Sequence, residues 1–171
     1  KKRFAKPFWL FLLLSVEAIG QPITPAGMLT EKGHYIHSDF NGKTYQLFVN
    51  LPDHYNAGDT AHYPVLYVLD GFYAFPLAYS TQMLLALDKQ IQDVIIVSIA
   101  DSVLDKRTWF ISRYSDFTPS RSAVTDSSTE AEYHLPRGSL TSGGASAFLM
   151  TIERQIIPFI NDHYKTTADR G

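Results

Sequence analysis

One stretch decides the fold of this 171-residue chain: Tyr63-Pro64-Val65-Leu66-Tyr67-Val68-Leu69-Asp70-Gly71-Phe72. Its unbroken apolar run, residues 65–69, stops at the turn signal Asp70-Gly71. A run of this length, rich in β-branched and aromatic residues, predicts a strand buried on both faces, as in a parallel sheet covered by helices. In open α/β sheets, ligand-binding and catalytic residues lie beyond the carboxyl ends of the strands. Asp70, Gly71 and Phe72 follow such an end.

A second apolar run, residues 94–99, follows a segment of good helix formers that contains Pro76 and ends near Gln90. Strand, helix and strand of these lengths predict a βαβ unit with parallel strands and a right-handed crossover. We expect Pro76 in the first helical turn, where the missing N–H of proline is tolerated.

Upstream, Asn41-Gly42 lies between strands predicted at residues 34–38 and 44–51, and this dipeptide is a strong hairpin signal. The fold class is therefore α/β. It combines an N-terminal hairpin with parallel strands, flanked by helices in three layers.

The second half of the chain begins with residues 101–142, which show no convincing hydrophobic period. A connection this long predicts a functional lid, a binding loop or a disordered insert. Residues 145–164 then predict one long helix, kinked near Pro158. Its apolar face contains Phe148, Ile152, Ile156, Phe159 and Ile160. Residues 165–171 are expected to lead into another strand.

Composition excludes several classes of function. The chain is 45% hydrophobic, long enough for one domain with a core, and carries a formal charge of −2, which gives no basis for nucleic-acid binding. It has no cysteine, and so no disulfide framework, thiolate metal site or cysteine nucleophile.

The N-terminus has the anatomy of a secretory signal peptide. Basic residues at 1–3 and 6 precede the apolar run 8–14, and Ala18-Ile19-Gly20 supplies small residues at a cleavage-site spacing. The run is shorter than the roughly 20 residues that span a bilayer, so we expect no membrane span after cleavage. An amphipathic or buried helix is the less favoured alternative. The predicted parts are a signal peptide (1–20), an extended lead-in (21–33) and the main domain (34–171). The mature protein would begin near Gln21 and be secreted or periplasmic.

Two patterns resemble catalytic motifs but are rejected. Gly144-Ala145-Ser146-Ala147-Phe148 begins like the nucleophile elbow Gly-x-Ser-x-Gly, yet a polar loop precedes it and Phe148 replaces the last glycine. We therefore expect Ser146 in the first turn of a helix. His34 and His37, three residues apart on a strand, would point to opposite faces and cannot share a metal.

The turn Asp70-Gly71-Phe72 is a better candidate because of its position. Backbone N–H groups after a buried strand are fixed donors of the kind an oxyanion hole requires. Taken alone, however, Asp-Gly after a strand is also a common turn.

Several stretches together resemble the Putative esterase (esterase D and enterochelin esterase-like) family of the α/β-hydrolases. They are residues 63–71, 113–119, 143–148 with 153–160, and 164–171, and the resemblance extends over about 35–171 in the order of the family. It implies that the nucleophile elbow, the acid and the histidine lie beyond Gly171, and that this chain is an N-terminal fragment.

The resemblance also implies roles for residues of this chain. The backbone N–H of Phe72, after Gly71, would be one oxyanion donor, and the second would follow the serine that this chain does not contain. Arg113, Asp116 and Phe117 match a family motif and would shape the substrate loop through an arginine–carboxylate contact. Trp109, Tyr114 and Phe117 either line an apolar acyl or aryl pocket or form the loop's own core.

The expected function is that of a serine ester hydrolase that acts on a small-molecule ester through an acyl-enzyme. No metal or organic cofactor is implied, and the fragment alone would be inactive. The alternatives are an acyltransferase of the same fold and a non-catalytic binding or accessory module. The sequence does not indicate an oligomeric state.

Overall fold

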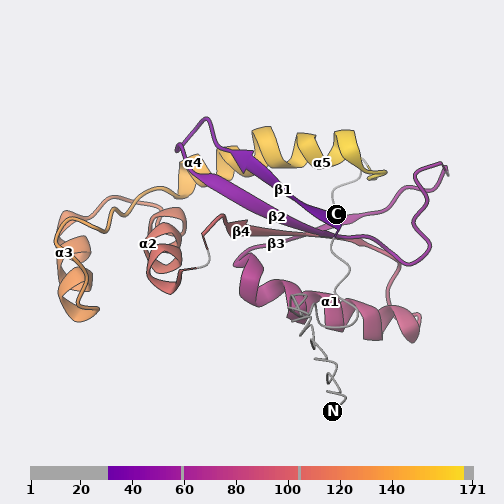
Figure 1. Ribbon diagram of the computed structural model, residues 1–171, viewed down its shortest axis with the longest axis horizontal. Helices are drawn as coiled ribbons and strands as arrows, with labels where there is room; N and C mark the ends of the chain where they lie inside the picture. Colours follow the sequence, from indigo (N-terminus) through magenta and orange to yellow (C-terminus); the bar gives the residue numbers. More distant parts are fainter. Residues whose placement is uncertain (1–30, 59, 104, 168–171) are drawn as a thin grey trace, which may run out of the picture.

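The computed structural model describes residues 31–58, 60–103 and 105–167. They form one mixed sheet of four strands in the order β1-β2-β4-β3, with α4 and α5 over one face and α1 over the other (Figure 1). This confirms a three-layer α/β fold. The elements are β1 (Glu31–His37), β2 (Thr44–Asn50), β3 (Val65–Val68), α1 (Gly71–Leu87), β4 (Ile95–Asp101), α2 (Lys106–Asp116), α3 (Ala123–Glu132), α4 (Ala145–Thr151), the π-helical turn η1 (Ile152–Ile156) and α5 (Ile157–His163).

The N-terminal hairpin is present as predicted. β1 and β2 pair antiparallel, and β1 begins at Glu31, three residues earlier than the sequence indicated. Gly42 has a φ of 70°, a left-handed conformation that glycine adopts without strain. The Asn41 side chain accepts a hydrogen bond from the Lys43 N–H at 3.1 Å and so closes the turn.

The parallel pairing of β3 and β4 confirms the βαβ unit, but the expected burial of β3 on both faces is wrong. β3 is the edge of the described sheet, and Leu66 is 47% exposed. The buried strand is β4, which lies between β2 and β3 and buries all its residues except Asp101. Beyond β3, an isolated parallel bridge joins Tyr63 to Thr166.

Helix α1 begins directly at the turn. The N–H groups of Tyr73 and Ala74 donate to the Asp70 carbonyl at 2.9 and 3.0 Å, so the helix starts at Gly71. The prediction that Pro76 lies in the first turn is therefore wrong: Pro76 lies inside the helix, as its sixth residue. At this position proline removes the N–H that would donate to the Phe72 carbonyl.

The predicted C-terminal helix is a continuous run in three parts, α4, η1 and α5. Its apolar face packs on the sheet as expected, with Phe148, Ile156 and Ile160 in the core. Instead of a simple kink at Pro158, the π-helical turn Ile152–Ile156 comes directly before α5. Proline cannot donate to the carbonyl of Arg154, and a widened turn is one way to accommodate that loss.

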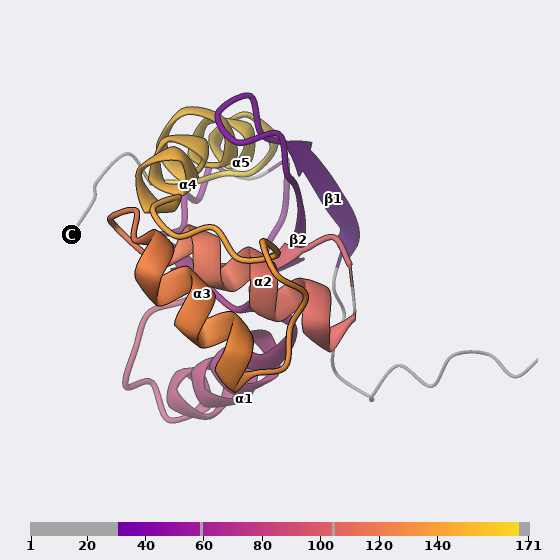
Figure 2. The ribbon, with the colours of Figure 1, turned by 90° about the vertical axis from the view of Figure 1, so that its left-hand side faces the viewer.

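The predicted structureless insert, residues 101–142, is wrong for about half of its length. It folds into α2 and α3, which pack at one end of the sheet (Figure 2). Within the described ranges, no helix has the length and apolar character needed to cross a membrane. The predicted signal peptide and all but the last three residues of the predicted lead-in lie outside the described residues.

Candidate active site

The site is built on the turn between β3 and α1. Asp70 adopts the left-handed conformation, with φ 55° and ψ 46°. Gly71 lies against the end of β4, where an added Cβ would be 2.7 Å from the Ala100 Cβ and 2.9 Å from the Ala100 nitrogen. Only glycine fits so close an approach. The turn is therefore fixed against the most deeply buried strand of the sheet.

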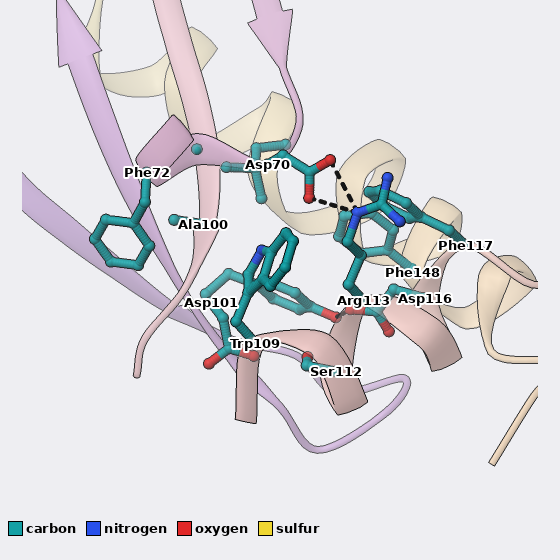
Figure 3. Close-up of a pocket in the computed structure, with 13 residues that line it drawn as sticks. Asp70, Phe72, Ala100, Asp101, Trp109, Ser112, Arg113, Asp116, Phe117 and Phe148 are labelled. Carbon is teal, nitrogen blue, oxygen red and sulfur yellow. Dashed lines mark hydrogen bonds and ion pairs between the residues drawn. The ribbon is translucent and has the colours of Figure 1, made fainter. Parts of the chain in front are cut away.

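The Phe72 N–H lies at the start of α1, on a residue that lines the cavity described below. The described part of the chain offers it no hydrogen-bond acceptor, since the first helical hydrogen bonds come from Tyr73 and Ala74. The Phe72 ring packs edge-on against Phe48, with ring centroids 5.3 Å apart. It points away from the Arg113 side of the turn (Figure 3). The backbone of Phe72, rather than its ring, is thus the group that can act in the site.

A small cavity of about 30 Å³ adjoins this turn, with room for about one water-sized group. Its walls come from the β3–α1 turn, the ends of β2 and β4, helix α2 and helix α4 (Figure 3). The lining residues are Tyr45, Asp70, Gly71, Phe72, Ile99, Ala100, Asp101, Trp109, Ser112, Arg113, Asp116, Phe117 and Phe148.

Arg113 connects α2 to the turn. Its Nε lies 2.9 and 3.0 Å from the two carboxylate oxygens of Asp70. Its guanidinium lies over the Phe117 ring at 4.6 Å and near the Trp109 ring at 5.8 Å. Trp109, Arg113 and Phe117 are spaced by four residues, so their side chains lie on one face of α2 and its C-terminal end. Arg113 does make an arginine–carboxylate contact, and its partner is Asp70.

Asp116 has a different and more buried partner set. Its two carboxylate oxygens accept from the Lys43 Nζ at 2.7 Å and from the Tyr45 hydroxyl at 2.9 Å. Burial raises the pKa of Asp116, although Lys43 opposes this shift. Burial and the neighbouring Asp116 carboxylate likewise raise the pKa of Tyr45. This network fixes α2 to the hairpin and so determines where Trp109 and Arg113 lie.

The structure brings six of the seven proposed site residues around one cavity. Gly71 and Phe72 meet Trp109, Arg113, Asp116 and Phe117 there. Tyr114 does not line it; its hydroxyl donates to Asp126 at 3.1 Å, and its ring lies 6.4 Å from that of Phe110. The three aromatic residues therefore fall into two groups. Trp109 and Phe117 line the cavity, whereas Tyr114 belongs to the core of the insert.

Sequence reasoning missed other walls of the cavity, among them Tyr45, Ser112 and Phe148. Tyr45 and Phe148 carried a signal, since both lie on predicted core faces, and their rings are 5.1 Å apart. Ser112 had none, because it lies in a segment without a convincing hydrophobic period.

The rejected motifs have structural roles. Ser146 is exposed in the first turn of α4. His34 bonds the Tyr164 hydroxyl at 2.7 Å, and His37 bonds the Thr44 hydroxyl at 3.2 Å. No group of three or more His, Cys, Asp or Glu side chains that could hold a metal ion occurs within the described ranges.

The fold is that of an α/β-hydrolase-type domain. Residues 38–171 match the family model described as "Putative esterase", and the chain belongs to this family. No curated protein matches the chain.

Solved structures of similar fold include the BES protein from Bacillus cereus, at 26% identity and a TM-score of 0.63. An "IroE-like serine hydrolase" from Shewanella oneidensis is 28% identical, with a TM-score of 0.62. The siderophore hydrolase EstB from Aspergillus nidulans, at 20% identity and a TM-score of 0.58, is similar in fold. The matches cover 85%, 79% and 78% of this chain but 50%, 39% and 44% of those proteins. This chain therefore spans about half or less of their length.

Proposed function

We propose that the full-length protein containing this chain is a serine ester hydrolase that acts on a small-molecule ester through an acyl-enzyme. The observation that carries this proposal is the Phe72 N–H at the start of α1, which has no partner among the described residues and lies beside a cavity of about 30 Å³. Membership of the Putative esterase family and the similarity to a serine hydrolase support it.

The position of Phe72 suits a donor to an oxyanion. It is the second residue of the 17-residue helix α1, whose aligned peptide dipoles favour negative charge at this end. The first turn of α1 contains no acidic residue that would compete for its N–H groups. A backbone donor held by a tight turn needs no reorganisation as charge develops on the carbonyl oxygen.

In this proposal the attacking serine comes from outside the described residues, as the resemblance to the family implies. Tyr63 pairs in parallel with Thr166. The Tyr63 N–H donates to the Lys165 carbonyl, and the Thr167 N–H donates to the Tyr63 carbonyl, each at 2.9 Å. A strand that continued from Thr166 would run alongside β3, and its carboxyl end would approach the Asp70 turn. A serine at that end would face Phe72, as a nucleophile faces its oxyanion donor.

In this scheme the serine hydroxyl gives its proton to a catalytic base as its oxygen bonds to the ester carbonyl carbon, and the Phe72 N–H donates to the resulting oxyanion. The alcohol then leaves with a proton from the catalytic base, and water releases the acid from the acyl-enzyme. Trp109, Phe117 and Phe148 supply apolar walls beside the position of the reacting carbonyl group. An acyltransferase would use the same acyl-enzyme but pass the acyl group to a second alcohol.

The test uses the full-length protein with p-nitrophenyl acetate and a serine-directed fluorophosphonate. We expect turnover, its loss on labelling, and a labelled serine outside residues 1–171. Ser146→Ala serves as the matched control and should keep full activity. Labelling of Ser146 would contradict the proposal. Absence of both turnover and labelling would instead indicate a non-catalytic module, and faster release of nitrophenol with added sugar or lipid alcohols would indicate an acyltransferase.

A further inference from the structure

Asp70 occupies the position at which an aspartate normally caps a helix, yet it does not cap α1. It is the N-cap residue, and its side chain makes no capping hydrogen bond. An N-cap carboxylate usually accepts from the N–H of the second or third helical residue, here Phe72 or Tyr73. The Tyr73 N–H already donates to the Asp70 carbonyl, so the Phe72 N–H is the free donor that such a cap would occupy.

The Asp70 carboxylate is held elsewhere by Arg113. Both of its oxygens accept from the Arg113 Nε, at 2.9 and 3.0 Å, and Figure 3 shows the side chain directed toward the guanidinium. The backbone of Asp70 is at the same time in the left-handed region, with φ 55°, rather than in the extended region typical of a capping residue. Left-handed aspartate is tolerated but strained relative to the extended conformation.

We infer that Arg113 is a positioning residue that keeps the Asp70 carboxylate away from the N-terminus of α1, so that the Phe72 N–H stays open for the oxyanion. Without Arg113, the turn can relax to an extended N-cap. The carboxylate would then occupy the Phe72 N–H and place a negative charge where the oxyanion has to form. Arg113 thereby preserves the donor that the site depends on.

Packing against two aromatic rings orients the Arg113 guanidinium toward Asp70. The guanidinium lies over Phe117 at 4.6 Å and near Trp109 at 5.8 Å, which fixes its plane and directs Nε at Asp70. Asp116 in turn is bound to Lys43 and Tyr45 and does not compete for Arg113. The site thus separates two carboxylates by giving each its own cation.

This inference rests on the proposed function, and its kinetic test uses the full-length protein with a neutral ester. Arg113→Ala should lower kcat by about 10- to 100-fold with little change in KM, because a blocked donor approaches the loss seen when such a donor is removed. Asp70→Gly should reverse the defect in the double variant, because glycine accepts a positive φ and has no carboxylate. We expect Asp70→Gly/Arg113→Ala to be about tenfold more active than Arg113→Ala. Arg107→Ala, also on α2 but exposed and outside the cavity, is the matched control and should stay within about twofold of the unmodified protein.

A second readout is independent of catalysis. Amide hydrogen exchange at Phe72 should slow in Arg113→Ala, because the carboxylate caps that N–H, and should stay fast in Asp70→Gly/Arg113→Ala. If Arg113→Ala is fully active, if the double variant is no better than Arg113→Ala, or if Phe72 exchange is unchanged, the inference is overturned. If the unmodified protein has no esterase activity but Phe72 exchange slows as described, the proposed function fails while the restraint on Asp70 stands.

Discussion

Gly71 lies so close to Ala100 that a Cβ at position 71 would stand 2.7 Å from the Ala100 Cβ. Gly71→Ala should therefore push the turn away from β4 and move the Phe72 N–H with it. We expect a loss of about 1–3 kcal/mol in the free energy of unfolding, typical of overpacking. Activity should fall at least about tenfold, because small displacements of catalytic donors are costly. Chemical denaturation and p-nitrophenyl acetate turnover of the full-length protein measure the two effects.

Gly58→Ala is the matched control for this change. An added Cβ there would meet the nearest atom, the Asn56 side-chain oxygen, at an ordinary 3.4 Å. It should leave both stability and turnover close to those of the unmodified protein. Equal behaviour of the Gly71 and Gly58 variants would show that the close approach to Ala100 does not position the turn.

Local signals were sufficient for the elements whose sequence reflects their own burial. The Asn41-Gly42 dipeptide gave the hairpin, and the apolar run at 94–99 gave the buried strand β4. The same signal failed for β3, because an apolar run does not tell a strand buried on both faces from one at the edge of the described sheet. The turn after β3 could be located as a candidate site from its position together with the resemblance to the family, because Asp-Gly after a strand is by itself a common turn.

Helix α2 could not be recognised in this way, because contacts remote in sequence hold it in place. The face of α2 that lines the cavity contains the charged Arg113 between aromatic residues. The sequence of α2 therefore shows no clear apolar period. Asp70 is 43 residues from Arg113, and Lys43 is 73 residues from Asp116. The local signal that was available is the cap, in which the Asp105 side chain accepts from the Thr108 N–H.

Lys43 is the cation that compensates the buried Asp116 carboxylate. The Asp116 side chain is 6% exposed and that of Lys43 is 27% exposed, with 2.7 Å between Nζ and Oδ1. Lys43→Met should leave the carboxylate without a cation and cost about 2–4 kcal/mol, somewhat below the value for a fully buried pair. The pKa of Asp116, already raised by burial, should rise further in this variant. Denaturant unfolding and NMR titration of Asp116 measure the two effects.

Lys106→Met provides the comparison for Lys43→Met. Lys106 is exposed and has no ion pair within the described residues. Its replacement should change stability by less than about 0.5 kcal/mol. A similar loss in both variants would mean that removal of a lysine, rather than of the Asp116 partner, is responsible.

The hydrogen bonds of the Glu130 carboxylate predict that the stability of the insert, residues 101–142, falls in acid. The carboxylate accepts from the backbone N–H of Leu140 at 2.8 Å and of Gly138 at 2.9 Å, and these hydrogen bonds lower its pKa from the ordinary value of 4.5. Because the folded pKa is below the unfolded one, the stabilisation is fully present above pH 4.5 and is lost as pH falls through the folded pKa. Glu130→Gln should be less stable at neutral pH, and its deficit should shrink on acidification. Thermal unfolding across this range tests the prediction, and a deficit independent of pH would contradict it.

Export is the remaining prediction, and it depends on the sequence alone. Basic residues, the apolar run 8–14 and Ala18-Ile19-Gly20 predict cleavage that leaves Gln21 at the N-terminus of the mature protein. Leu12→Arg interrupts the apolar run and should prevent both cleavage and export. Met28→Arg adds the same charge beyond the cleavage site and should be processed normally. N-terminal sequencing of the exported full-length protein, with fractionation of the cells, measures the outcome. An exported protein that still carries Lys6, or efficient processing of Leu12→Arg, would show that residues 1–20 do not act as a cleaved signal.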